Sequence, residues 1–170
     1  MKLTPIRLFT LIMLLSISYT ACSEDLIKSE FEKLRALVGD WQGTLPDGGV
    51  IEITYEEISG GAIVEIYHST DPMWWNMSSV YHLDKNQILM THYCSWGNHP
   101  RMSAHPDATQ DINELEFNVI DIATTQPTNG YMHNLHISFK DKTHLSHQWI
   151  WRDKGKDTPL TLTLVKKKDI

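Results

Sequence analysis

Cysteine is scarce in this sequence, since Cys22 and Cys94 are the only two among 170 residues. A chain with two cysteines forms at most one intramolecular disulfide, so a small fold held together by several bridges is excluded. The stability of the folded domain must therefore come from a buried core, for which a chain of this length is sufficient.

Several motifs that mark common enzymes are also missing. The chain contains no G-x-S-x-G nucleophile elbow, no G-x-G-x-x-G turn and no phosphate-binding Walker loop. Chelating pairs with C-x-x-C or H-x-x-x-H spacing are absent as well. An enzyme that acts on a small metabolite is therefore the less favoured interpretation, and no catalytic residue is assigned.

Positive charge is low relative to negative charge. The 15 Lys and Arg residues against 21 Asp and Glu give a net charge of −6 at pH 7. Two of the basic residues, Lys2 and Arg7, lie in the N-terminal segment, so the rest of the chain is more acidic still. Because an acidic surface repels phosphate backbones, we expect no nucleic acid as a partner.

Residues 1–21 are typical of a signal peptide. Lys2 and Arg7 form its positive start, an apolar run covers residues 8–17, and the small residues Thr20 and Ala21 precede a cleavage site. The apolar run is too short for a stable membrane span. We therefore expect these residues to direct export and then to be removed.

Cys22 stands where a bacterial lipoprotein carries its lipid-modified cysteine, and residues 19–22 (Tyr-Thr-Ala-Cys) resemble a lipobox. Acyl chains on Cys22 would anchor a soluble domain to a membrane. We therefore expect an exported lipoprotein, in the periplasm or at the outer membrane, with residues 22–30 as a tether and 31–170 as the folded domain. Cleavage without acylation is the alternative.

Residues 23–40 show a helical pattern. Phe31, Leu34, Leu37 and Val38 recur at the spacings of one apolar face. Glycine is common at helix ends, so the Gly39–Asp40 pair is expected to end the helix. The apolar face predicts that the helix packs on the rest of the domain.

From residue 41 onward apolar and polar residues alternate with a period of two, and turn signals recur at short intervals, which is the pattern of an all-β fold. Two proline-containing segments, 95–111 and 123–130, are expected to be loops. About nine or ten antiparallel strands in sequence order would close most simply into an up-and-down β-barrel, which leaves no exposed edge. The predicted strands are 41–45, 50–58, 62–69, 78–83, 88–94, 114–122, 131–140, 143–152 and 160–167.

Residues 91–102 (T-H-Y-C-S-W-G-N-H-P-R-M) resemble the H-Y-C-x-x-G-N-x-P-R-M signature of a family of exported bacterial proteins without assigned activity. Residues 39–43, and residues 131–133 followed by the aromatic strand at 149–151, also resemble that family. The resemblance covers residues 28–167 and implies a lipocalin-like, or calycin-type, β-barrel.

Gly39-x-Trp41 further resembles the lipocalin motif in which a tryptophan closes the base of the barrel beneath an arginine from a late strand. This resemblance implies that Trp41 and Arg152 form a structural cation–π pair.

The predicted ligand site consists of a few polar residues around an apolar barrel interior. Strand alternation places His92, His133 and His147 on inward faces, with Trp149 beside His147. Asn98 and Arg101 follow in the segment expected to be a loop at the barrel mouth. We therefore expect a small apolar or amphipathic molecule to bind among the residues His92, Asn98, Arg101, His133, His147 and Trp149.

The sequence is compatible with further functions. Inward histidines and a thiol suit zinc, copper or haem iron, and resemblance to nitrobindin-like folds allows a haem- or metal-binding barrel. Tyr131 stands where the exported family carries a histidine, so a paired-histidine site is not complete there. An enzyme of the cell envelope and a purely structural lipoprotein fit the sequence too, because a fold does not decide a function.

Overall fold

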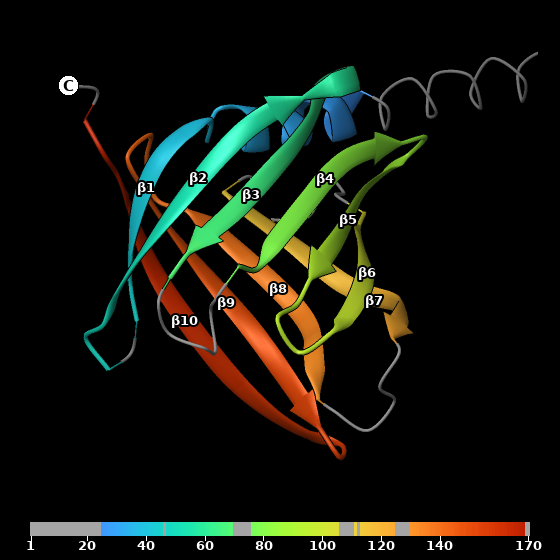
Figure 1. The fold of residues 1–170 in the computed structure, drawn as a ribbon. Helices are drawn as coiled ribbons and strands as arrows, with labels where there is room; N and C mark the ends of the chain where they lie inside the picture. Colours follow the sequence, from blue (N-terminus) through green and yellow to red (C-terminus); the bar gives the residue numbers. More distant parts are fainter. Residues whose placement is uncertain are drawn as a thin grey trace, which may run out of the picture.

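The structure is a computed structural model that describes residues 25–45, 47–69, 76–105, 111, 113–124 and 130–168. Ten antiparallel strands form one closed barrel in which each strand pairs with its neighbours in sequence, and β1 pairs with β10 (Figure 1). The predicted up-and-down β-barrel with one short N-terminal helix is therefore confirmed. The expected signal peptide and Cys22 lie outside the described residues.

The strands follow one another with short connections. A 3-10 turn, η1 (Ser59–Gly61), separates the second strand from the third, and the helix covers residues 25–35. The strands are β1 (Gly39–Thr44), β2 (Val50–Ile58), β3 (Ala62–His68), β4 (Ser78–Asp84), β5 (Gln87–Tyr93), β6 (Asn98–Ala104), β7 (Glu114–Thr124), β8 (Tyr131–Phe139), β9 (His144–Asp153) and β10 (Lys156–Lys166).

Strand β6 was not predicted, because its segment contains Pro100 and was expected to be a loop. The ladder between β5 and β6 ends at the pair Thr91↔Arg101, so Pro100 lies just beyond it. Pro100 still pairs with Ile122 of β7, close to the register shift between Arg101 and Met102, and proline is tolerated in strands at bulges. Asn98, Pro100 and Met102 are buried and alternate with more exposed residues, so the segment keeps the period of a strand despite its proline.

The helix lies over one end of the barrel, at the top of Figure 1, and the β9–β10 hairpin lies at the other end. Its buried residues include Ile27, Phe31 and Leu34. The helix ends at residue 35, earlier than predicted, since β1 already begins at Gly39 with a φ of 125°. Val38 is consequently 40% exposed instead of lying on the buried face.

Within the described part of the chain, no helix is long and apolar enough to cross a membrane. Of the segment predicted to be a tether, residues 25–30 are helical.

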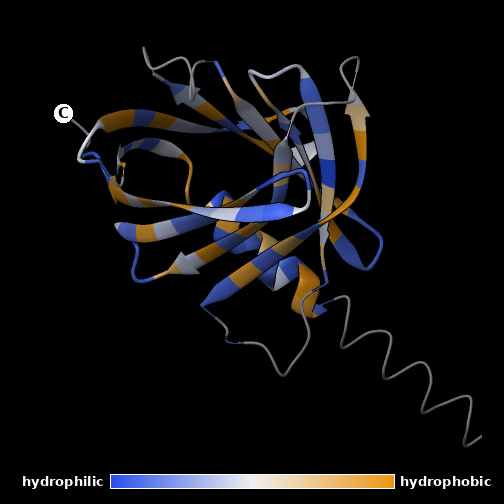
Figure 2. Cartoon of the chain, turned by 90° about the horizontal axis from the view of Figure 1, so that it is seen from below, coloured by the Kyte–Doolittle hydropathy of each residue, from blue (hydrophilic) through white to orange (hydrophobic). Residues whose placement is uncertain are grey.

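The core fills the inside of the barrel because the strands keep apolar residues on one face. Figure 2 shows hydrophilic and hydrophobic residues alternating along the strands. In β2, for example, Ile51, Ile53 and Tyr55 are buried, and in β10 the buried residues are Leu162 and Leu164. The alternation therefore determines which side chains meet inside the barrel.

Candidate functional site

Trp41 lies fully buried at the helix-covered end of the barrel, where its Nε1 donates a hydrogen bond to the Leu37 carbonyl at 2.7 Å. The prediction that Arg152 pairs with Trp41 is wrong. The cation over the ring is Lys166, whose Nζ lies 5.5 Å from the ring centroid, because β1 and β10 pair Trp41 with Lys166. Arg152 instead binds Asp157 across the β9–β10 hairpin, with Nε 2.6 Å from Oδ1.

A carboxylate is buried in the interior next to this end. Glu65 of β3 is completely buried, and its two oxygens accept hydrogen bonds from the hydroxyls of Tyr55 at 2.8 Å and Tyr81 at 2.7 Å. His147 lies beside them, with Nε2 3.2 Å from the Tyr55 hydroxyl and Nδ1 3.3 Å from Glu65 Oε1. Each oxygen of the carboxylate therefore has a polar neighbour.

Burial controls ionisation in this cluster. It raises the pKa of Tyr55 and Tyr81, and the charge of Glu65 raises both further. Burial lowers the pKa of His147, although Glu65 opposes this change. The tyrosines therefore remain hydrogen-bond donors at neutral pH, and His147 remains uncharged.

Glu65 was missed by the sequence reasoning. Its strand reads I-V-E-I-Y, with apolar residues on both faces, so a carboxylate is expected to point outward. The structure instead buries Ile63, Glu65 and Tyr67 and leaves Val64 and Ile66 partly exposed. Glu65 and Tyr67 are two residues apart in β3 and therefore share a face. This spacing was the feature of the sequence that could have placed Glu65 inside the barrel.

His92 occupies the next part of the interior. Its Nδ1 lies 3.0 Å from the Ser79 hydroxyl, and its ring centroid lies 4.8 Å from that of Trp149. Trp149 Nε1 in turn donates to the Tyr67 hydroxyl at 3.3 Å. Burial, followed by the nearby His99, lowers the pKa of His92 to about 3, so the ring is neutral.

The structure places His92, His147 and Trp149 inside the barrel, as the alternation predicts. None of them lines the pocket described below, so contact of these three side chains with a ligand stays a prediction.

His133 does not join them. The register of β8 shifts between Met132 and Asn134, so that one extra residue is inserted there. Met132 is therefore buried, whereas His133 lies beside the pair formed by Arg152 and Asp157. The predicted convergence of His133 with His92 is wrong, because a bulge interrupts the period of two on which it rested.

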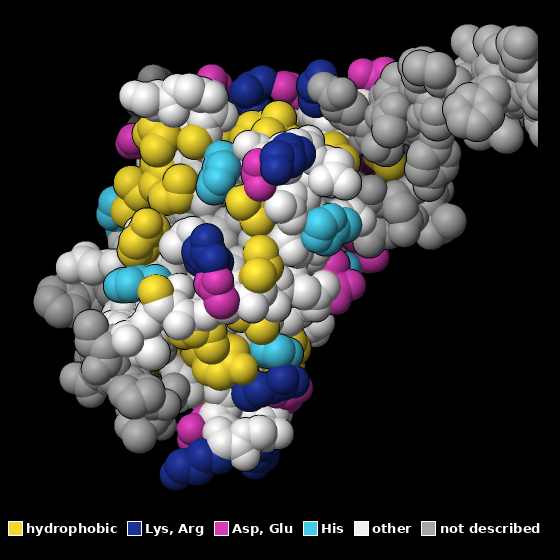
Figure 3. Space-filling view, turned by 90° about the vertical axis from the view of Figure 1, so that its right-hand side faces the viewer, with side chains coloured by type: hydrophobic (Ala, Val, Ile, Leu, Met, Phe, Trp, Pro, Cys, Tyr) yellow, Lys and Arg dark blue, Asp and Glu magenta, His cyan; other side chains and the backbone are white. Residues whose placement is uncertain are grey.

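Arg101 does not lie over the pocket either. Its side chain is 57% exposed and forms a bidentate ion pair with Asp121 of β7. Nε lies 2.7 Å from Oδ1, and a terminal guanidinium nitrogen contacts Oδ2. Figure 3 views the molecule from the side of β5 to β7 and shows basic and acidic side chains next to one another among hydrophobic and histidine side chains. The predicted ligand contact of Arg101 is therefore replaced by a surface ion pair.

Asn98 is buried at the start of β6, and its side chain holds the backbone of Gly130. Its Nδ2 donates a hydrogen bond to the Gly130 carbonyl at 3.0 Å. Gly130 packs directly on Trp151, since a Cβ at this position would lie only 2.5 Å from the indole ring. Asn98 therefore positions Gly130, and Gly130 supports the Trp151 ring.

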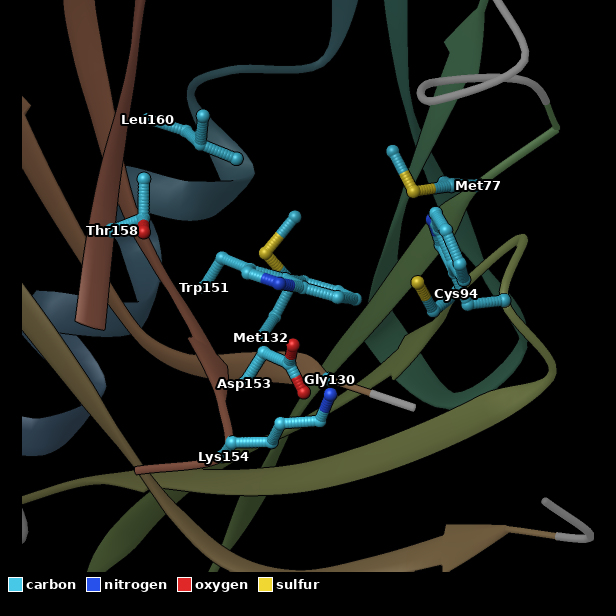
Figure 4. Close-up of a pocket in the computed structure, with 10 residues that line it drawn as sticks. Met77, Cys94, Gly130, Met132, Trp151, Asp153, Lys154, Thr158 and Leu160 are labelled. Carbon is cyan, nitrogen blue, oxygen red and sulfur yellow. The ribbon is translucent and has the colours of Figure 1, made fainter. Parts of the chain in front are cut away.

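Gly130 and Trp151 border a pocket of about 400 Å³ at the end of the barrel opposite the helix (Figure 4). Its inner wall consists of Met77, Cys94, Met132, Trp151 and Leu160. Burial raises the pKa of the Cys94 thiol, which therefore stays protonated at neutral pH. The wall is thus apolar and uncharged.

The mouth of the pocket carries its polar groups. Asp153, Lys154 and Thr158 line it, and Figure 4 shows the side chains of Asp153 and Lys154 next to each other. Trp96 is 49% exposed there, and its ring centroid lies 5.8 Å from that of Trp151. Ligand sites of proteins commonly combine an apolar wall with a few polar groups in this way.

A histidine-ligated haem does not fit this pocket. Among its described lining residues there is no histidine, and the buried His92 is not part of the wall. The part of the chain that the structure describes also contains no group of three or more His, Cys, Asp or Glu residues arranged to hold a metal ion.

Comparisons with known proteins bear on the fold alone. No protein-family model and no curated protein matches the chain. The crystal structure of Rv2717c from M. tuberculosis is similar, with a TM-score of 0.55 and 14% sequence identity over 82% of this chain and 98% of that one. A redesigned beta barrel gives a TM-score of 0.35 and 9% identity over 80% of this chain and 95% of that one.

Proposed function

We propose that this protein binds a small, largely apolar molecule in the pocket opposite the helix. The observation that carries the proposal is the cavity itself. A volume of about 400 Å³ lies within the range of ligand sites, and the inner wall of this open pocket is apolar.

The chemistry of the lining defines the kind of ligand. An apolar body would contact Met77, Met132 and Leu160 and would be removed from water there. A polar end would remain at the mouth, within reach of Lys154 and Thr158. The ligand is therefore amphipathic, with its polar end outermost.

A fluorescent apolar dye tests this proposal. N-phenylnaphthylamine is excited beyond the absorption of tryptophan, and its emission should rise when it enters the pocket. Thr158→Trp fills the mouth and should weaken dye binding roughly tenfold or more, which corresponds to about 1.4 kcal/mol.

Thr161→Trp is the matched control, because Thr161 lies three residues along the same strand, is exposed and does not line the pocket. Equal dye affinity of the two variants would contradict the proposal.

We further propose that Cys22 is acylated and anchors the barrel to a membrane of the cell envelope. Residue 25, three residues further along, is the first described residue of the helix, and the helix covers the end opposite the pocket. An anchor at Cys22 would therefore leave the pocket mouth directed away from the membrane. Intact mass of the mature protein from membranes should show acyl chains that Cys22→Ser removes, and an unmodified mature chain would refute the anchor.

A further inference from the structure

We infer that the pocket selects a flat aromatic molecule over an aliphatic chain of similar size, and that Gly130 sets this selectivity by supporting the Trp151 ring. The inference rests on the proposed function, since it names the class of ligand for the same pocket.

The composition of the pocket wall favours aromatic ligands. Met77, Cys94, Met132, Trp96 and Trp151 contribute sulfur atoms and indole rings, and Leu160 is the one branched aliphatic residue among the described lining. The rest of the core contains more isoleucine and leucine, together with aromatic residues such as Trp149 and the methionines Met90 and Met102. The described lining of the pocket differs from it by having few branched aliphatic side chains.

The physical consequence concerns ring-shaped ligands. Thioether sulfur gains about 0.3–1.5 kcal/mol from contact with an aromatic ring, and stacked or edge-on ring pairs gain about 0.5–1.5 kcal/mol beyond burial. An aliphatic chain gains only the burial itself. Several such contacts around one ligand would favour the ring.

The lining residues come from separate parts of the barrel wall. Met77 and Cys94 lie next to β4 and β5, whereas Met132 and Trp151 lie in β8 and β9. The ring centroids of Trp96 and Trp151 are 5.8 Å apart, and both indoles line the pocket. They therefore offer adjoining aromatic surfaces to a ligand.

The Trp151 ring packs on the backbone of Gly130. The carbonyl of Gly130 is held by Asn98, and a Cβ on Gly130 would lie 2.5 Å and 2.6 Å from two ring carbons of Trp151. Any side chain at position 130 would force the Trp151 ring out of its present position. The backbone of Gly130 lies outside the left-handed region, so Gly130→Ala tests the ring contact without backbone strain.

The experiment compares naphthol with octanol, which carry one hydroxyl each and are of similar size, by titration calorimetry. The parent protein should bind naphthol roughly tenfold more tightly or better. Gly130→Ala should lower this ratio severalfold. Gly49→Ala, at a glycine in the distant β1–β2 turn, is the matched control and should keep it.

A double substitution tests the sulfur atoms separately. Met77→Leu with Met132→Leu should lower the naphthol-to-octanol ratio toward one. Met90→Leu with Met102→Leu removes two thioethers that are buried elsewhere in the barrel and should leave the ratio unchanged.

The outcomes separate the two proposals. Equal affinities for naphthol and octanol in the parent protein overturn the aromatic selectivity but leave the proposed ligand site intact. Failure of the dye and of both alcohols to bind overturns both. If Gly130→Ala does not fold, Asn98→Ala replaces it, because this change removes the hydrogen bond to the Gly130 carbonyl. Asn98→Ala should still lower the naphthol-to-octanol affinity ratio. An unchanged ratio refutes the role of Gly130.

Discussion

The two ends of the barrel interior use similar residues in different ways. At the helix-covered end Trp41 is completely buried, and Glu65 is surrounded by hydrogen-bonding side chains. At the opposite end Trp151 is only half-buried and borders a cavity of about 400 Å³. The helix-covered end contributes packing to stability, whereas the described residues at the opposite end leave apolar surface available to a ligand.

The largest expected effect separates the two tryptophans. Trp41→Ala should lower the free energy of unfolding by about 3–5 kcal/mol, because a large buried side chain leaves a cavity. Trp151→Ala should lower it by about 1 kcal/mol, since this ring already faces open space. Guanidinium unfolding followed by circular dichroism measures both, and equal losses would show that the two ends do not differ in packing.

A smaller effect concerns carboxylates at the two ends. Glu65→Leu should lower the free energy of unfolding by about 2–3 kcal/mol, because the buried hydroxyls of Tyr55 and Tyr81 lose their acceptor. Glu65→Gln retains one acceptor oxygen and should cost less. Asp153→Asn at the pocket mouth should leave the unfolding curve unchanged. If it lowered the free energy of unfolding as much as Glu65→Gln does, the carboxylates at the two ends would not differ in their contribution to stability.

The smallest effect is a dependence on pH. Burial lowers the pKa of His92 to about 3 and also lowers that of His147, while an unfolded chain titrates near 6.5. The unfolded state therefore binds more protons below pH 6.5, so the stability from these rings is complete above that pH and is lost as the pH falls toward 3.

His92→Phe should make the fall in stability between pH 6.5 and 4 shallower, as measured by urea unfolding at several pH values. His82→Phe, at an exposed position, should keep the slope of the parent protein. An identical slope in both variants would show that His92 is not a source of the acid sensitivity.

Regular strands were predictable and irregular ones were not. Alternation placed His92 in β5 and His147 and Trp149 in β9 inside the barrel, because both strands keep a period of two there. The same reasoning placed His133 inside, where a bulge in β8 reverses the face. A bulge depends on pairing with a neighbouring strand, and residues within one strand do not reveal it.

The partners of the polar side chains could not be predicted from the sequence either. Arg101 and Asp121 are 20 residues apart, and their ion pair follows from the pairing of β6 with β7. Asn98 was expected to touch a ligand, but its hydrogen bond goes to Gly130, 32 residues away. These partners could not be read from the sequence because strand register decides them.

The sequence by itself determined the all-β class, the N-terminal helix and most strands, because side-chain alternation and turn residues act over a few neighbouring positions. The tertiary structure alone decided that Lys166 and not Arg152 covers Trp41, that Glu65 lies in the core, and that a cavity opens beside Trp151. Each of these depends on closure of the ten-stranded barrel, which brings residues from distant strands together in a register set by hydrogen bonding around the whole ring.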